Sequence, residues 1–267
     1  MTGDAPPEAL LPPPEVTRVH TLWDALADFG AHETDAAALH AMRVLSDLVG
    51  AQRAFWLGAV RLGVDLDSLG GWRIRGMLRM NPTSEDDQVY KLSRQRLDHG
   101  TADEVTRAQV REAGVFRARG LRELAPPSFF ATRDYDVLYR ARGISDAIFA
   151  ASPVNEDAES YFGWYRIGEE SSRFTPVDRE LLAFALRPLK WLHRHVMLHH
   201  GLLIAKAPLT PVERRLLSLL LTERIEKEIA HELHLTLATT HTYITGLFRK
   251  FGVSGRAGLT ALWLGHG

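Results

Sequence analysis

The sequence contains no cysteine among its 267 residues, which excludes disulfide bonds, thiolate metal sites and cysteine nucleophiles. It also lacks any run of about 18 apolar residues, the length that a membrane-spanning helix needs. The first residues have neither the basic nor the apolar region of a secretory signal. These absences predict a cytoplasmic protein that has no membrane partner.

The sequence also has no large excess of positive or negative charge. The chain has 32 basic and 33 acidic residues and a formal net charge of −1, so it is not basic throughout. From Lys206 onward, however, eight basic residues stand against five acidic ones. An anionic partner is therefore expected only at the C-terminal end.

The common catalytic motifs are absent too: the sequence has no GxGxxG, GxxxxGK[ST] or GxSxG pattern. His231 and His234 are three residues apart, whereas a zinc-binding HExxH motif needs a spacing of four. Four more histidines lie close together, and we interpret them as partly exposed side chains at the end of a helix: His193, His195, His199 and His200. We expect no catalytic residue, no metal, no cofactor and no enzymatic activity.

Proline and periodicity divide the chain into segments. Five prolines in residues 1–15 predict a disordered arm, and residues 201–208 predict a linker. Residues 16–200 form the expected α+β domain between them. Its expected elements are helical structure at 22–49 and 85–113, strands at 54–62 and 72–80, a hairpin of 147–151 with 160–167, and a long helix after Thr175 that Pro188 kinks.

The stretch from about Asp134 to Leu192, with its ending RIGEESSRFTPVDRELL, resembles the GAF/PAS-like sensory domains that precede helix-turn-helix output domains in bacterial regulators. The resemblance implies an antiparallel sheet with flanking helices and a sensory or dimerisation role. Six aromatic residues of this half are candidates for a ligand pocket, although they also suit a core: Trp56, Trp72, Tyr135, Tyr139, Phe149 and Trp164.

The C-terminal segment 209–267 has clear helix signals. Thr210 and Glu213 form a capping box, a second helix is expected at 226–233, and Thr236 caps a third helix that Gly252 ends. A fourth helix is expected at 257–264. Four short helices with a tight turn between the second and third predict an all-α helix-turn-helix, whose third helix can enter a DNA major groove.

The motifs LTPxE, KEIAxxL, TTxxYI, FRKFGV and RAGL make this segment resemble the LuxR-type (GerE-like) DNA-binding domain over its full length. Where that family's recognition helix has Val and His, this chain has Thr240 and Tyr243. The family's lysines that contact the DNA backbone correspond to Lys227 and Lys250. The residues predicted to bind DNA are Lys227, Thr236, Thr239, His241, Thr242, Tyr243, Thr245, Arg249 and Lys250.

These observations predict a sequence-specific transcriptional regulator that binds double-stranded DNA as a homodimer. A small-molecule effector and contact with RNA polymerase are further expected partners. The Trp/Tyr/Asp spacing of acyl-homoserine-lactone receptors is missing, which disfavours that class of effector. The alternative is a protein-interaction or dimerisation scaffold whose helix-turn-helix does not bind DNA.

Overall fold

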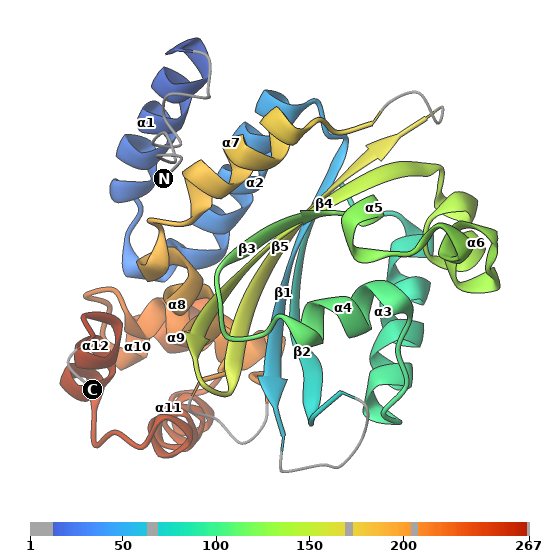
Figure 1. Ribbon diagram of the computed structural model, residues 1–267. Coiled ribbons are helices and arrows are strands. Elements are labelled where there is room, and N and C mark those ends of the chain that lie inside the picture. Colours follow the sequence, from blue (N-terminus) through green and yellow to red (C-terminus); the bar gives the residue numbers. More distant parts are fainter. Residues whose placement is uncertain (1–12, 63–68, 169–172, 204–207, 266–267) are drawn as a thin grey trace.

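A computed structural model describes residues 13–62, 69–168, 173–203 and 208–265. In this part of the chain, one five-stranded antiparallel sheet has the strand order β2-β1-β5-β4-β3 (Figure 1). The strands are β1 (Arg53–Arg61), β2 (Trp72–Met80), β3 (Arg117–Gly120), β4 (Ile144–Asn155) and β5 (Ala158–Ile167). The α+β class and the predicted hairpin, which is β4 and β5, are confirmed. The narrower GAF/PAS resemblance stays a prediction.

Helices cover both faces of the sheet (Figure 1). On one face lie α1 (Pro13–Ala27), α2 (Thr34–Val49), α7 (Pro176–Leu186) and α8 (Lys190–His199). On the other lie α3 (Ser84–Asp98), α4 (Glu104–Arg111), α5 (Leu121–Leu124) and α6 (Arg133–Leu138). Short 3₁₀ helices occur at Ala31–Glu33 (η2), Pro127–Ala131 (η3) and Arg140–Arg142 (η4).

Strand alternation decides which side chains reach which layer. Successive residues of a strand point to opposite faces, so Trp56 and Trp164 enter the core under α2 and α8, while Phe55 and Tyr165 face α3, α4 and α6. Both faces are therefore rich in aromatic side chains, but the two sets do not meet.

The structure corrects two of the predicted segments. Helix α1 begins at Pro13, so residues 13–15 of the expected arm are helical, because proline is tolerated in the first turn of a helix. Residues 1–12 lie outside the described part. The expected long helix is two helices, since the chain leaves the helical path around Pro188, which has no N–H to donate.

The C-terminal helices form a separate core. They are α9 (Pro211–Leu220), α10 (Glu226–Glu232), α11 (Leu237–Phe251) and α12 (Arg256–Trp263). Leu216, Leu217, Ile229, Leu247 and Leu259 pack together between them. The predicted caps are confirmed: Thr210 accepts from the Glu213 N–H, Thr236 from the Thr239 N–H, and Gly252 has a φ of 66°.

The C-terminal helices contact the N-terminal part through α8. Arg194 Nη1 donates to the Leu262 carbonyl at 2.6 Å, and His195 Nε2 lies 2.9 Å from the Trp263 carbonyl. The histidine interpretation needs correction here, because His193, His199 and His200 are buried: α8 packs between the sheet and α9. Of the expected linker, 201–208, Leu202 is also buried, and residues 204–207 are not described.

Across the described ranges, no helix combines the length and apolar character needed to cross a membrane. The same residues contain no group of three or more His, Asp or Glu side chains arranged to hold a metal ion.

Candidate DNA interface and ligand cavity

Helices α10 and α11 form the helix-turn-helix. The turn contains His234, whose positive φ of 54° is uncommon for a residue with a side chain, and the Leu235 N–H donates to the Ala230 carbonyl at 2.9 Å. Thr236 then caps α11 by accepting from Thr239 N at 3.1 Å. These bonds fix the direction in which α11 leaves the turn.

The predicted DNA-binding residues share one property, which is exposure to solvent: Lys227, Thr236, Thr239, His241, Thr242, Tyr243, Thr245, Arg249 and Lys250. Thr240, by contrast, is fully buried with Ile244, Leu247 and Phe251. Its hydroxyl donates to the Thr236 carbonyl at 3.0 Å, so it replaces an apolar residue without leaving a polar group unpaired. The structure thus presents one polar and one buried face of α11, and DNA contact itself stays a prediction.

The cations near α11 differ in how strongly they are engaged. Lys250 Nζ lies 2.7 Å from Glu213 Oε1, and His241 Nδ1 lies 3.2 Å from Glu226 Oε1. Lys227 and Arg249 have no ion pair with any residue that the structure describes. Lys227 and Arg249 are therefore without a carboxylate partner in the described part of the chain, whereas Lys250 is paired with Glu213.

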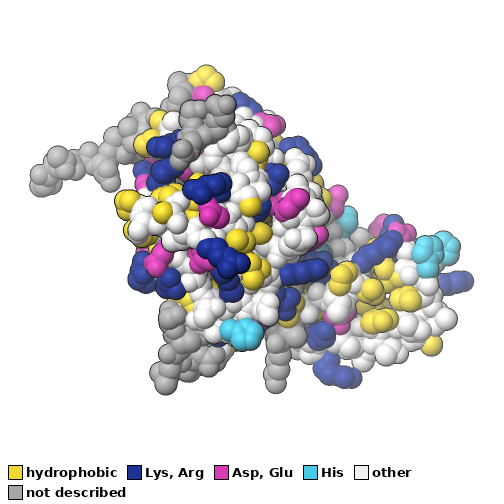
Figure 2. All heavy atoms as spheres, turned by 90° about the vertical axis from the view of Figure 1, so that its right-hand side faces the viewer, with side chains coloured by type: hydrophobic (Ala, Val, Ile, Leu, Met, Phe, Trp, Pro, Cys, Tyr) yellow, Lys and Arg dark blue, Asp and Glu magenta, His cyan; other side chains and the backbone are white. Residues whose placement is uncertain are grey.

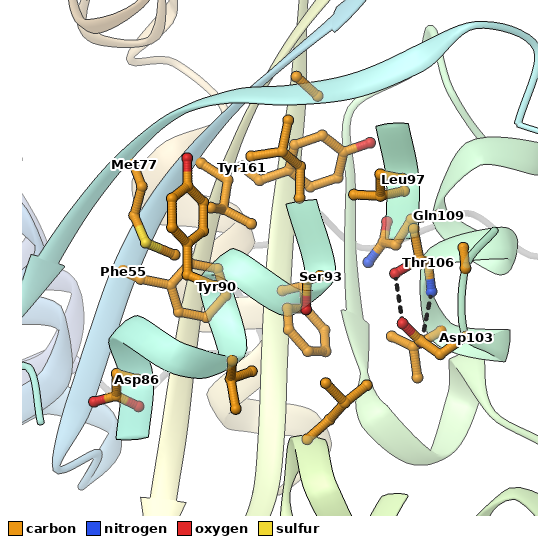
Figure 3. A pocket seen from close by; sticks show the side chains of 18 of the residues that line it. Phe55, Met77, Asp86, Tyr90, Ser93, Leu97, Asp103, Thr106, Gln109 and Tyr161 are labelled. Carbon is orange, nitrogen blue, oxygen red and sulfur yellow. Dashed lines mark hydrogen bonds between the residues drawn. The ribbon is translucent and has the colours of Figure 1, made fainter. Parts of the chain in front are cut away.

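A cavity of about 190 Å³ lies in the N-terminal part, between the sheet and helices α3 and α4. One water needs roughly 10–15 Å³ of such volume, so the cavity can hold a much larger molecule. Figure 3 shows Phe55, Met77 and Tyr90 toward one side of it and Leu97 and Gln109 toward the other.

Three of the six predicted pocket aromatics line this cavity: Trp72, Tyr139 and Phe149. Tyr135 stacks on Tyr139, with ring centroids 5.7 Å apart, and does not line the cavity itself. Trp56 and Trp164 are fully buried on the opposite face of the sheet. Trp56 donates to Ser160 Oγ at 2.8 Å there, so both indoles belong to the core under α2 and α8.

One end of the cavity is built around Asp86. Its Oδ2 accepts from Thr83 N at 2.8 Å in the capping box of α3, and its Oδ1 accepts from Arg142 Nε at 3.1 Å and from Arg142 Nη2. Burial alone would raise the pKa of Asp86, but these hydrogen bonds hold it below the usual value. Asp86 is therefore an ionised carboxylate whose acceptor positions are already used.

The other end rests on the buried ion pair of Arg117 and Glu159. Arg117 Nη2 lies 2.9 Å from Glu159 Oε2 and donates to the Tyr161 hydroxyl at 2.7 Å. Arg117 Nε donates to Gln109 Oε1 at 3.0 Å. Because Arg Nε can only donate, this contact assigns the amide oxygen of Gln109 and directs its Nε2 away from Arg117.

Sequence reasoning did not single out the polar residues that carry the cavity's two ends, which are the lining residues Arg53, Arg79, Asp86, Gln109 and Arg142 and the ion pair of Arg117 and Glu159 beside Gln109. A signal existed for Gln109. It lies on the buried face of α4 with Val105 and Ala108. A glutamine on an apolar helix face is expected to have a hydrogen-bond partner in the interior. The arginines and carboxylates meet only through tertiary structure, which local patterns do not reveal.

Charges outside the cavity do not form a single patch on the side that carries α3 and α6. Figure 2 views this side and shows Lys and Arg side chains lying beside Asp and Glu. Ion pairs such as Arg96 with Asp134, 2.8 Å apart, account for part of this pattern. This face therefore lacks the continuous basic stripe that favours nucleic-acid binding.

Comparison with known proteins concerns the C-terminal helices first. Residues 207–263 match the family model GerE, described as bacterial regulatory proteins, luxR family. The C-terminal segment is a luxR-family helix-turn-helix domain. The predicted resemblance is thereby confirmed for this part of the chain.

A known regulator is similar to this chain over a stretch of comparable length. Over 60 residues the chain is 45% identical to the transcriptional regulatory protein MctR of Rhizobium johnstonii, an alignment that covers 22% of this chain and 28% of that protein. The chain thus matches less than a third of the length of MctR.

Solved structures with lower similarity cover more of the chain. Escherichia coli SdiA has a TM-score of 0.47 at 13% identity, covering 94% of this chain and 97% of its own. A structure of SdiA in complex with octanoyl-rac-glycerol also has a TM-score of 0.47, at 12% identity and with coverage of 94% and 95%. The VqsR LBD domain of Pseudomonas aeruginosa has a TM-score of 0.45 at 15% identity, with 64% and 90% covered. TM-scores below 0.5 do not establish a common fold, so the cavity has to be interpreted from its own residues.

Proposed function

We propose that the protein is a transcriptional regulator that binds double-stranded DNA through its luxR-family domain and responds to a small molecule in the N-terminal cavity. The observation that supports DNA binding is the exposed polar face of α11, held by the Thr236 cap at the end of a tight turn. A helix presented in this way can enter a major groove.

The side chains of α11 suit two kinds of contact. His241, Thr242 and Thr245 are exposed and short enough to approach base edges, while Lys227 and Arg249 carry the charge that attracts phosphates. We assign base selection to the first group and general affinity to the second.

Salt dependence tests DNA binding directly. Binding of the full chain to duplex DNA should weaken steeply as salt rises, because each neutralised phosphate releases counterions. Fragments selected from genomic DNA by the purified protein would provide the specific site. An inability to bind any duplex at low salt would favour the alternative, a protein-interaction scaffold.

Variants divide the two kinds of contact. Lys227→Ala should weaken binding to all sequences alike and reduce the salt slope by about one unit, as expected for one lost phosphate contact. His241→Ala should instead change which base is preferred at one position. Lys91→Ala, an exposed lysine on α3, is the matched control and should alter neither quantity. A sequence-selective loss from Lys227→Ala would contradict this assignment.

We further propose that the protein acts as a homodimer, because two recognition helices related by a two-fold axis read half-sites about one DNA turn apart. The sequence favours the end of the long helix after Thr175 as the dimer contact, through Trp191, Leu192 and Met197, but Leu192 and Met197 are buried in the core. Only Trp191 reaches the surface, with 38% of its area exposed. Sedimentation should show a dimer on a specific fragment that contains two half-sites, and a bound monomer would remove this proposal.

Ligand response is the second part of the proposal, and it is supported by the size and lining of the cavity. A ligand can shift DNA affinity only if it binds two arrangements of the protein differently. The test is therefore DNA affinity measured with and without a compound that binds the cavity. Contact with RNA polymerase stays an expectation from the family resemblance.

A further inference from the structure

We propose that the cavity under α3 and α4 takes an organic anion: a carboxylate with an apolar body and a second hydrogen-bond acceptor away from its charged group. This inference rests on the ligand-binding role proposed above and adds the chemical class. It depends on which buried polar atoms of the cavity have partners and which do not.

The charges at the Asp86 end are unequal. Three arginine side chains meet here, Arg53, Arg79 and Arg142, whereas the carboxylates that pair with them are Asp86 and Asp87. Arg142 has 8% of its side chain exposed, and Arg53 and Arg79 have about a fifth, so water screens these charges only in part. Among these closely paired groups the arginines outnumber the carboxylates by one, while the exposed Glu85 also interacts with Arg53 at longer range. The buried part of this end therefore favours an anion over a cation.

The hydrogen bonds at this end also indicate an anionic ligand. Arg53 Nη1 lies 3.7 Å from Asp86 Oδ1, too far for a hydrogen bond, and Asp86 is already used by Thr83 and Arg142. Arg79 uses Nη2 for Asp87. Arg53 Nη1 and Arg79 Nη1 are both buried and have no acceptor among the residues that the structure describes.

Two buried guanidinium donors without acceptors are costly to leave unpaired. Both residues line the cavity, and they come from the paired strands β1 and β2. A carboxylate offers two acceptor oxygens, as many as there are unpaired guanidinium donors, and its negative charge matches theirs.

Gln109, at the opposite side of the cavity, has a second unpaired hydrogen-bond donor. The residue is 93% buried, since 7% of its surface is exposed, and its Nε2 has no acceptor in the described part of the chain. The Arg117 contact fixes the amide so that Nε2 is the free donor. Figure 3 shows this nitrogen directed into the cavity, well apart from Asp86. A hydroxyl or carbonyl oxygen of the ligand would complete this hydrogen bond.

Apolar side chains line the cavity as well. The rest of the lining includes the apolar residues Phe55, Leu57, Met77, Val89 and Leu97. An unbranched or aromatic hydrocarbon body buries well against these residues, whereas a sugar or nucleotide would leave its many polar groups unpaired. The expected ligand is therefore amphipathic, with its polar atoms at two separated positions.

Straight-chain carboxylates from hexanoate to tetradecanoate, their neutral alcohols and their ammonium analogues test the charge class. Calorimetric titration of the full chain should show the preferred carboxylate binding at least roughly 10-fold tighter than the alcohol of equal length, because a charge-assisted hydrogen bond contributes more than a neutral one. The ammonium compound should not bind detectably. Within the preferred length, hydroxylated carboxylates should include one isomer that binds tighter again.

Variants assign each effect to its residue. Arg53→Met and Arg79→Met should each weaken carboxylate binding by roughly 10-fold or more and leave the alcohol within about 3-fold. Arg43→Met, an exposed arginine on α2, is the matched control. Gln109→Leu should remove the gain from the hydroxyl and leave the plain carboxylate unchanged, with the exposed Gln95→Leu as its control. Thermal melting shows whether each variant folds, and two independent arginines keep the test decisive if one variant does not.

The outcomes separate this inference from the proposed function. Equal affinity for carboxylate and alcohol, or insensitivity to both arginine variants, would overturn the anion class while ligand binding stands. An absence of binding by every carboxylate would also overturn it. DNA binding by the same preparation is measured separately, so a failure there concerns the proposed function and not the ligand class.

Discussion

At the residue scale, Arg117 and Glu159 form a fully buried ion pair in the N-terminal part. The two side chains are 2% and 0% exposed, and Arg117 also supports Gln109 and Tyr161. Removing one charge strands the other in a region of low dielectric constant, which typically costs 3–5 kcal/mol. Arg117→Met should therefore lower the free energy of unfolding by roughly 3 kcal/mol or more in a urea titration.

The double variant provides the control for this prediction. When both charges are replaced, as in Arg117→Met with Glu159→Met, no buried charge is left unpaired, and such replacements are often close to neutral. The double variant should be more stable than Arg117→Met alone. A double variant that is less stable than the single one would show that Arg117 acts through its packing and not through its charge.

Buried histidines make stability depend on pH. Burial lowers the pKa of His193 and of His199 to about 4 from the ordinary 6.5. Between pH 6.5 and 4 the unfolded chain therefore binds protons that the folded chain does not. The stabilisation is complete above pH 6.5 and is lost as pH falls toward 4, by about 3 kcal/mol for His193.

Urea unfolding at pH 7.5, 6 and 5 checks this pH dependence. His193→Gln can keep a hydrogen bond to Ser160, which lies 2.8 Å from His193 Nδ1, but it cannot titrate. This variant should lose less stability between pH 7.5 and 5 than the natural sequence. The same slope in both proteins would mean that His193 is not the responsible group.

Helices and strands differ in how much the sequence reveals of them. The caps at Thr175, Thr210 and Thr236 and the β4–β5 hairpin could be predicted because their signals are local: a hydroxyl at the right spacing, or a polar turn between apolar runs. Strand β3 could not, because the four residues RARG become a strand only by pairing with β4.

The cavity shows the same limit. Alternation in β1 separates Phe55 from Trp56, but periodicity alone does not say which face will hold a cavity and which will be filled by α2 and α8. The predicted aromatics were therefore divided between the two faces. By contrast, the exposed positions Thr239, His241, Thr242 and Thr245 of α11 followed from the 3.6-residue period of the helix and were predicted.

Strands β1 and β2 also contact Leu202, which lies in the segment that leads to the luxR-family domain. Gly58 and Gly76 are paired across these strands, and a Cβ at Gly58 would lie 2.2 Å from Leu202 Cδ1. Gly58→Ala should therefore displace Leu202 and expose residues 201–203. Limited proteolysis should cut there faster in this variant.

Two further variants test this interpretation. Gly246→Ala is the control, because the added Cβ meets nothing within 4 Å apart from the backbone of its own helix and its chain neighbours, and the cleavage rate should not change. Adding Leu202→Ala to Gly58→Ala removes the main clash, so the fold should tolerate the added methyl group better. Unchanged proteolysis in Gly58→Ala would show that the backbone accommodates the methyl group without moving Leu202.

At the scale of the whole molecule, the two parts meet at a polar contact around His200. His200 Nε2 lies 3.1 Å from Asp35 Oδ1 in α2, and Arg214 Nη1 of α9 donates to His200 Nδ1 at 2.9 Å. Burial lowers the pKa of His200, although Asp35 opposes this effect. A neutral imidazole that donates to Asp35 and accepts from Arg214 fits both contacts. This triad and Leu202 thus connect the cavity-bearing part to the luxR-family domain, in addition to the bonds of Arg194 and His195 to α12.

The last prediction concerns how these connections transmit ligand binding. Coupling between two sites is typically 1–3 kcal/mol, so a bound ligand should change DNA affinity by roughly 5- to 150-fold, and DNA should change ligand affinity by the same factor. Arg214→Met removes the α9 partner of His200 while leaving the cavity and α11 intact. It should preserve ligand affinity without DNA and reduce the ligand's effect on DNA affinity toward one-fold. An isolated 208–267 fragment should fold, because most of its core is internal, and should bind DNA without ligand response. Full coupling in Arg214→Met would show that the triad is not on the path, and the sheet contact of Leu202 would then be the connection to test.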